Sequence, residues 1–228
     1  ALAIVIGSSV YSFTLILLAF LIGLSGGAAL TTRLLPSVRR PVRALAITHA
    51  LTLLTALWSF FILPRLPATF VSLLRGSSFT IDGLLATQFV LAALAMAPAT
   101  LAMGGVMPLT MHVFTLRRKI AGDYPADAPS IGSDVGTAYA WNTLGAITGS
   151  FAAGFFVLPE LGLQRGLIAC SLLTATLSAT LFLADRGRAA RALALSCVFV
   201  AGLAAWLLPR WNLTHFSAGL FRISLARQ

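Results

Sequence analysis

Six stretches of this sequence contain no aspartate, glutamate, lysine or arginine, and this pattern limits the fold more than any other feature. They cover residues 1–32, 44–64, 83–116, 135–159, 166–184 and 192–209. A helix that crosses a bilayer needs about 20 mostly apolar residues, and a chain with 58% hydrophobic and 10% charged residues cannot form a soluble surface. The sequence therefore predicts an all-α fold, a polytopic membrane helix bundle of about six transmembrane helices. The bundle is expected over residues 1–209, followed by a tail or linker over residues 210–228.

The net charge of +10 is distributed over the loops between these stretches. Basic residues are not interleaved with aromatic ones, so no nucleic-acid partner is expected. Residues 33–43, 117–119 and 186–191 hold four, three and three Lys or Arg, whereas the second and fourth loops hold two and one. Because cytoplasmic loops are enriched in Lys and Arg, the first, third and fifth loops are predicted to be cytoplasmic. With six helices, the tail then lies on the side opposite the cytoplasm. Its three arginines argue against that side, because basic residues are enriched in the cytoplasm.

The third stretch contains a predicted helix break. Pro98 and Pro108 flank Gly104 and Gly105, and this combination removes backbone donors and offers little resistance to bending. Transporters use such broken helices to bind substrates with freed backbone groups. A proline kink that only improves helix packing is the alternative.

Two pairs of glycines have the spacing of four residues that lets membrane helices approach closely. They are Gly23 with Gly27 and Gly145 with Gly149, and Gly154 extends the second pair. We expect these glycines to pack helices together, either within one bundle or against a membrane protein partner or a second copy of the chain.

Few polar side chains fall within the predicted spans, and each is either a functional candidate or a hydrogen-bonding contact between helices. The candidates for lining a substrate cavity are Asn142, Tyr139, Trp141, Gln88, His112 and His49. No carboxylate lies deep in a span, which argues against a proton-coupled pump. The sequence also lacks paired catalytic carboxylates, a metal-ligand cluster and a phosphate loop, so we expect no catalytic residue, no metal site and no cofactor in this chain.

An ordered set of motifs connects the chain with a known family. The stretch Tyr139-Ala-Trp-Asn-Thr-Leu-Gly145, followed by Gly149 and by Gly154-Phe-Phe-Val-Leu-Pro159, resembles the membrane part of bacterial fused spermidine-synthase-like proteins, in which a major-facilitator-like part is joined to a spermidine synthase. Three further matches follow the family's order. They are residues 7–13 with 20–24, residues 98–104 with 107–109, and Trp211 with residues 217–222.

The resemblance implies a multi-pass, non-catalytic module of a polyamine aminopropyltransferase-type protein in the inner membrane of a bacterial cell. In that family another span precedes the region of Gly7, so we expect a seventh helix to be missing at the N-terminus. A synthase domain follows the region of Arg222 in the family and would bind decarboxylated S-adenosylmethionine. No position of this chain matches the nucleotide loop or the acidic residues of that domain, so this chain alone is not expected to be an enzyme.

Two other functions agree with the same sequence. The chain could be a transporter or exporter of polyamine-like small solutes, or a structural or accessory subunit of a larger membrane protein complex. A charged or aromatic solute pathway would favour transport. A glycine face exposed on the lipid side would favour assembly.

Overall fold

The computed structural model describes residues 10–66, 69, 72, 81–121, 130–185 and 187–207. The predicted tail at 210–228 and the first residues of the predicted N-terminal span lie outside these ranges. All regular elements of the described residues are helices, in agreement with the predicted fold class. The α-helices are α2 (Val10–Leu34), α3 (Pro41–Ile62), α5 (Ile81–Gly104), α6 (Val106–Ala121), α7 (Ser130–Ala152), α8 (Gly162–Ala184) and α9 (Arg188–Leu207). Two short 3-10 helices, η1 (Leu35–Ser37) and η2 (Leu63–Arg65), follow α2 and α3, and a π-helix, η3 (Ala153–Leu161), follows α7.

Four segments of the described residues are long and apolar enough to cross a membrane: Val10–Ser37, Pro41–Arg65, Asp82–Arg118 and Gly132–Ala184. A shorter apolar helix covers Ala189–Ala205. The last of the four long segments has 53 residues and contains α7, η3 and α8. These lengths and compositions identify a membrane-embedded helical protein, and the count of six crossings stays a prediction.

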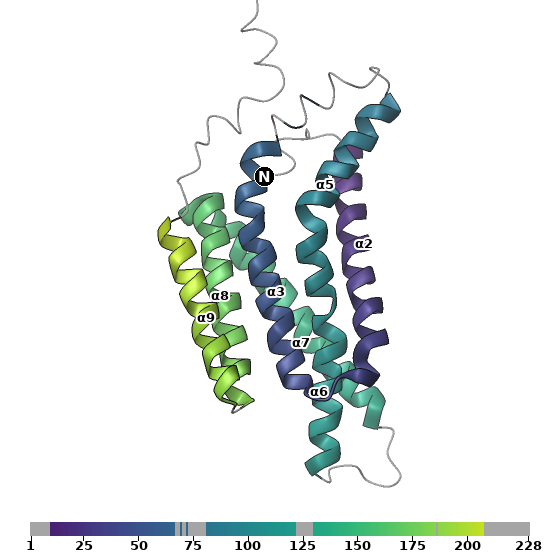
Figure 1. Ribbon diagram of the computed structural model, residues 1–228. Coiled ribbons are helices and arrows are strands. Elements are labelled where there is room, and N and C mark those ends of the chain that lie inside the picture. The colour runs from purple at the N-terminus through teal and green to yellow at the C-terminus, as the bar shows by residue number, and fades with distance from the viewer. Residues whose placement is uncertain are drawn as a thin grey trace, which may run out of the picture.

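Five helices form a row in the order α2, α5, α3, α8, α9, in which each helix packs against the next (Figure 1). Helix α6 continues the line of α5 and also packs against α3 and α2. The end of α2 and the start of α3 lie at the lower end of Figure 1, and so do the ends where α6 precedes α7 and where α8 precedes α9. These helix ends flank the first, third and fifth loops, so the fold brings the borders of the three most basic loops to one end of the bundle.

Local sequence explains where these helices begin and end. Pro36 follows α2, which ends at Leu34, and Pro41 occupies the first turn of α3, where its missing N–H group leaves no hydrogen bond unmade. Helix α5 ends at Gly104, and α6 starts after a turn at Gly105. Pro108 falls in the first turn of α6, whereas Pro98 lies inside α5 without ending it.

The buried side chains are mostly small, and many large apolar side chains are exposed. One core cluster joins α2, α5 and the segment of η2 and Leu66 that follows α3, through Ala19, Leu63, Leu66, Leu91, Ala92 and Ala95. A second joins α3, α8 and α9 through Ala46, Ala179, Phe182, Ala190 and Ala194, and a third lies beside it at Leu53, Ala175 and Ala201. Small residues between helices and large apolar residues outside are typical of membrane bundles, because helices there associate by close packing and not by exclusion from water.

Candidate functional site: the exposed glycine face of α7

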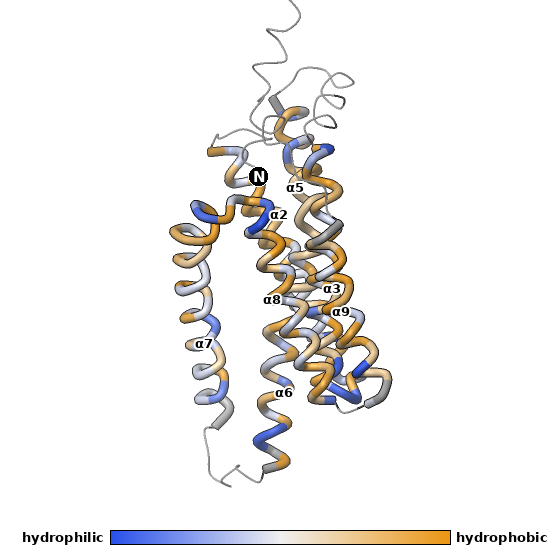
Figure 2. Tube along the Cα trace, turned by 90° about the vertical axis from the view of Figure 1, so that its left-hand side faces the viewer, coloured by the Kyte–Doolittle hydropathy of each residue, from blue (hydrophilic) through white to orange (hydrophobic). Residues whose placement is uncertain are grey.

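Helix α7 stands apart from the row of helices over most of its length (Figure 2). It packs mainly against α6 at its beginning and against η3 at its end. Every residue from 139 to 156 is exposed, whichever side of the helix it occupies. Among the described residues, no atom lies within 4 Å of the position that a Cβ atom would take at Gly145, Gly149 or Gly154.

One face of α7 is built from small residues and one amide. Asp134, Ala138, Asn142, Gly145, Gly149 and Ala152 follow one another at intervals of three or four residues, which places them on the same side of a helix. We call this set the glycine face. The opposite side carries Leu144, Ile147 and Phe151, all of them exposed.

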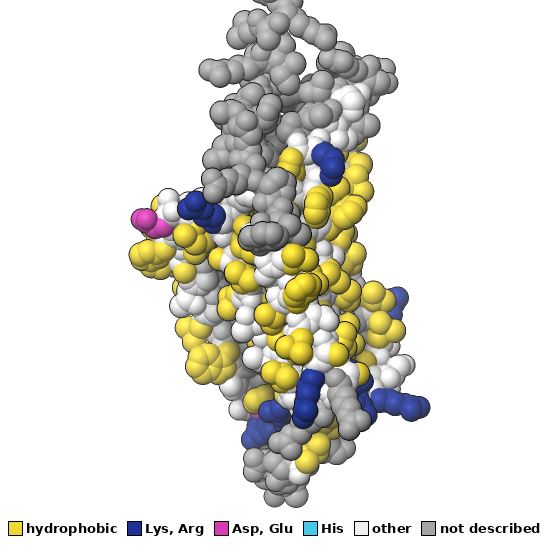
Figure 3. All heavy atoms as spheres, turned by 60° about the vertical axis from the view of Figure 1, so that its left-hand side comes forward, with side chains coloured by type: hydrophobic (Ala, Val, Ile, Leu, Met, Phe, Trp, Pro, Cys, Tyr) yellow, Lys and Arg dark blue, Asp and Glu magenta, His cyan; other side chains and the backbone are white. Residues whose placement is uncertain are grey.

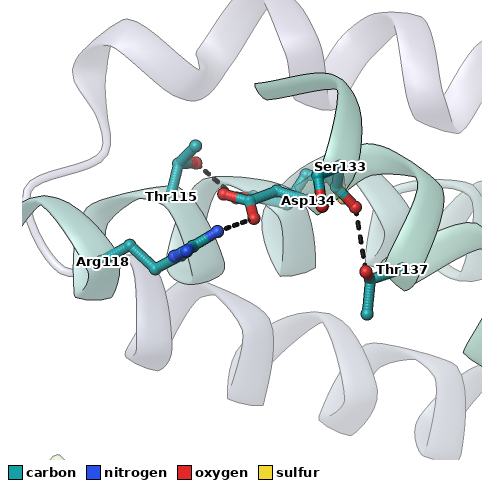
Figure 4. A network of polar contacts seen from close by, with 6 residues as sticks. Thr115, Arg118, Ser133, Asp134 and Thr137 are labelled. Atoms are coloured by element: carbon teal, nitrogen blue, oxygen red, sulfur yellow. Dashed lines mark hydrogen bonds and ion pairs between the residues drawn. The ribbon is translucent and has the colours of Figure 1, made fainter. Parts of the chain in front are cut away.

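An ion pair holds the first turns of α7 against α6. The side chain of Arg118 donates to Oδ1 of Asp134, and the carboxylate is only 2% exposed (Figure 4). The other carboxylate oxygen, Oδ2, is buried and has no hydrogen-bond partner among the described residues. Because Asp134 belongs to the glycine face, this face is turned toward α6 at that end of the helix.

The far end of α7 continues into η3, which connects it to α8. Phe151 packs against Phe155 and Phe156, with ring centroids 4.8 and 5.8 Å apart. The chain then turns at Gly162, whose φ of +73° is one that residues with a side chain rarely adopt. The sequence predicted a span that ends at Pro159, and the structure instead includes this proline in the π-helix.

The other glycine pair, Gly23 and Gly27 in α2, is packed tightly against α5. A Cβ atom at Gly27 would overlap the backbone of Leu101 in α5, and one at Gly23 would overlap the side chain of Thr100. From the other side, a Cβ atom at Gly104 would overlap the carbonyl group of Leu24, and it would lie 3.0 Å from the backbone nitrogen of Ala28. Helices α2 and α5 therefore meet backbone to backbone.

At the helix break predicted near Gly105, helix α2 packs against the backbone. Gly104 and Gly105 are both buried, and a Cβ atom at Gly105 would lie 2.5 Å from Oγ1 of Thr31 in α2. The backbone at this break therefore faces α2.

The predicted cavity-lining residues are not gathered at one place. Gln88 is 6% exposed, and its Oε1 accepts a hydrogen bond from Ser12 of α2 at 3.4 Å. His49 in α3 and His112 in α6 are half-buried. Tyr139 and Trp141 are 56% and 71% exposed on α7, and Asn142 is exposed as well.

Two polar contacts between helices were not predicted from the sequence. Ser178 of α8 is fully buried and donates to the carbonyl oxygen of Ala46 at 2.9 Å. Asp185 accepts from Nε of Arg43 at 2.6 Å and joins the start of α3 to the end of α8. Ser171, Ala175, Ser178 and Ala179 lie at helical spacing, and this small-residue pattern was the available signal for the first contact.

No family model, curated protein or solved structure matches this chain. Its function is therefore inferred from the geometry described above and from the motifs of the sequence.

Proposed function

We propose that this chain is a non-catalytic, multi-pass membrane module for protein assembly, in which the glycine face of α7 receives a further transmembrane helix. One observation carries the proposal. The small residues of the glycine face at Gly145, Gly149 and Ala152 lie within residues 139–156, a stretch in which every residue is exposed.

The chemistry of the glycine face fits a helix as its partner. Glycines spaced by four residues permit close contact between helix backbones, as α2 and α5 demonstrate within this chain. An exposed amide such as Asn142 is costly in hydrocarbon and is stabilised by a hydrogen bond across a helix contact. The large apolar residues on the other side of α7 are suited to lipid.

The motifs shared with bacterial fused spermidine-synthase-like proteins support a more specific version of the proposal. In this version the module belongs to the inner membrane and holds a synthase-like domain, with the additional helix supplied by the same larger protein or by a companion chain. An aminopropyltransferase assay on the protein isolated from its natural membrane, together with its intact mass, tests this version.

A transporter of polyamine-like solutes has less support. The helix break that could bind a solute is covered by α2, and Gln88 is buried against Ser12 of the same helix. Uptake of labelled spermidine into proteoliposomes that contain the purified protein would favour transport over assembly.

Substitutions on the two sides of α7 test the assembly proposal. We expect Gly145→Leu with Gly149→Leu to remove a helical partner that copurifies in fixed stoichiometry, because leucine side chains would hold the two backbones apart. The measurement is the mass and stoichiometry of the complex in native mass spectrometry. Ala140→Leu is the matched control, since Ala140 is exposed on the opposite side of the same helix, and it should leave the complex intact.

Either of two results would contradict the assembly proposal. The double variant could retain its partner as well as the wild type does, or the wild type could be isolated as a single chain with no partner. Leucine is a better helix former than glycine, so the loss of a partner cannot be attributed to unfolding of α7.

The predicted orientation has its own test. If six helices cross the membrane and the three most basic loops are cytoplasmic, alkaline phosphatase fused after Gln228 should be active, because this enzyme requires the oxidising periplasm. A fusion within residues 33–43 should be inactive. The reverse pattern of activities would overturn the orientation.

A further inference from the structure

We propose that the arginine-rich end of the bundle is a binding surface for anionic phospholipids. This surface consists of the helix ends that flank the first, third and fifth loops, which lie together at the lower end of Figures 1 and 3. It is independent of the assembly role of α7, because it does not involve the glycines of that helix.

The charge of this end exceeds what the protein itself can neutralise. In the sequence, the three loops and their flanking turns contain ten Lys or Arg and four Asp residues. Figure 3 shows basic side chains gathered there. The other loops between the predicted spans hold three arginines, one aspartate and one glutamate, so among these loops most of the excess positive charge lies at one end.

The two aspartates described at this end already have arginine partners. Asp185 pairs with Nη2 of Arg43 at 2.5 Å and lies 3.7 Å from Nη1 of Arg40. Asp134 pairs with Arg118. Both carboxylates are largely buried, with side chains 12% and 3% exposed, so neither is open to a second partner from solvent.

Four arginines remain at this end with exposed side chains and no ion pair among the described residues: Arg33, Arg39, Arg117 and Arg191. A guanidinium group presents a planar set of donors that matches two oxygens of a phosphate. Phosphodiester oxygens are therefore the ligand chemistry that these side chains favour.

Apolar side chains beside the arginines distinguish a lipid from a soluble anion. Exposed Leu30 and Leu34 flank Arg33 on α2, and exposed Leu116 and Ile120 flank Arg117 on α6. Arg191 is followed by exposed Leu193 and Leu195 on α9. A phospholipid offers both a phosphate for the arginine and acyl chains for these neighbours, whereas inorganic phosphate offers only the first.

Lipid nanodiscs provide the test. We compare the purified protein in discs of phosphatidylcholine alone with discs in which about a third of the lipid is phosphatidylglycerol, and we count retained lipids by native mass spectrometry. Each basic side chain near an anionic surface contributes about 1 kcal/mol, so removing two arginines should weaken retention of phosphatidylglycerol by more than tenfold. The test variant is Arg33→Gln with Arg39→Gln.

The matched control is Arg65→Gln with Arg165→Gln, because both of these arginines are exposed and lie in the second and fourth predicted loops. The proposal requires that the wild type and the control retain phosphatidylglycerol in preference to phosphatidylcholine and that the test variant lose this preference.

Three results would overturn the proposal. The first is a wild type that retains both lipids equally, and this comparison does not depend on the folding of any variant. Equal losses in the two variants would also overturn it, because they would indicate a response to net charge alone. A third opposing result is displacement of the bound lipid by millimolar inorganic phosphate, which would identify a site for soluble anions.

Discussion

Gly27→Ala is expected to destabilise the protein strongly although it adds a single methyl group. In this structure the added Cβ atom would overlap the backbone carbonyl group of Leu101. A backbone group cannot rotate away, so α2 and α5 would have to separate along their length. Overpacking of this kind typically costs about 1–3 kcal/mol, and we expect a decrease near the upper end of this range in the free energy of unfolding. Titration with dodecyl sulfate in mixed micelles, followed by circular dichroism, measures this change.

Two neighbouring glycines provide graded controls for this prediction. At Gly26 the added Cβ atom would lie 3.3 Å from Cδ2 of Leu101, the end of a flexible side chain, so Gly26→Ala should be neutral or stabilising through its higher helix propensity. At Gly23 the obstacle is the side chain of Thr100, and the expected loss is intermediate. Equal effects of the three substitutions would show that α2 and α5 do not meet as described.

Arg118→Met is the second change for which we expect a large effect. It leaves Asp134 as a buried carboxylate without its ion-pair partner, at a position where Oδ2 already has no hydrogen bond among the described residues. Breaking a buried ion pair from one side costs about 3–5 kcal/mol. The lower end of this range applies because Arg118 itself is partly exposed. Faster hydrogen exchange in the first turns of α7, measured by mass spectrometry, should accompany the loss of stability.

A double substitution shows whether the charge or the shape of this pair matters. Arg118→Met with Asp134→Asn removes both charges, and it should recover most of the stability lost in Arg118→Met, because the uncompensated carboxylate is no longer present. If the double variant is as unstable as the single one, the ion pair is not what holds α7 to α6.

The apolar helices of this protein could be read from its sequence with useful accuracy. The stretches predicted at 44–64, 166–184 and 192–209 correspond to α3, α8 and α9 within a few residues. They could be predicted because only a long run of residues without charge can be buried in lipid, whereas the true starts at Pro41 and Gly162 lie a few residues before these runs. The helix break expected around Gly104 and Gly105 occurs at Gly105.

The surroundings of each helix could not be predicted in the same way. Two glycine pairs with the same spacing have opposite environments. Gly23 and Gly27 are in tight contact with α5, whereas a methyl group added at Gly145 or Gly149 would meet no atom of the described part of the chain within 4 Å. Spacing determines which residues share a face, but long-range packing determines what that face meets. For the same reason, the sequence predicted that Gln88 and Asn142 line one cavity. In the structure, Gln88 of α5 contacts Ser12 of α2, whereas Asn142 lies on the exposed surface of α7.

The π-helix η3 controls the direction in which the glycine face of α7 points. Hydrogen bonds in a π-helix join residues five apart, so each turn holds more residues than an α-helical turn. In an α-helix each residue advances the chain by about 100°. Residues of η3 therefore advance the chain by less than this angle, and rewinding η3 as regular α-helix would rotate α7 about its own axis relative to α8. The winding of the nine residues of η3 thus sets the rotation of α7 about its own axis, and a change in this winding would change the direction in which Asn142 faces.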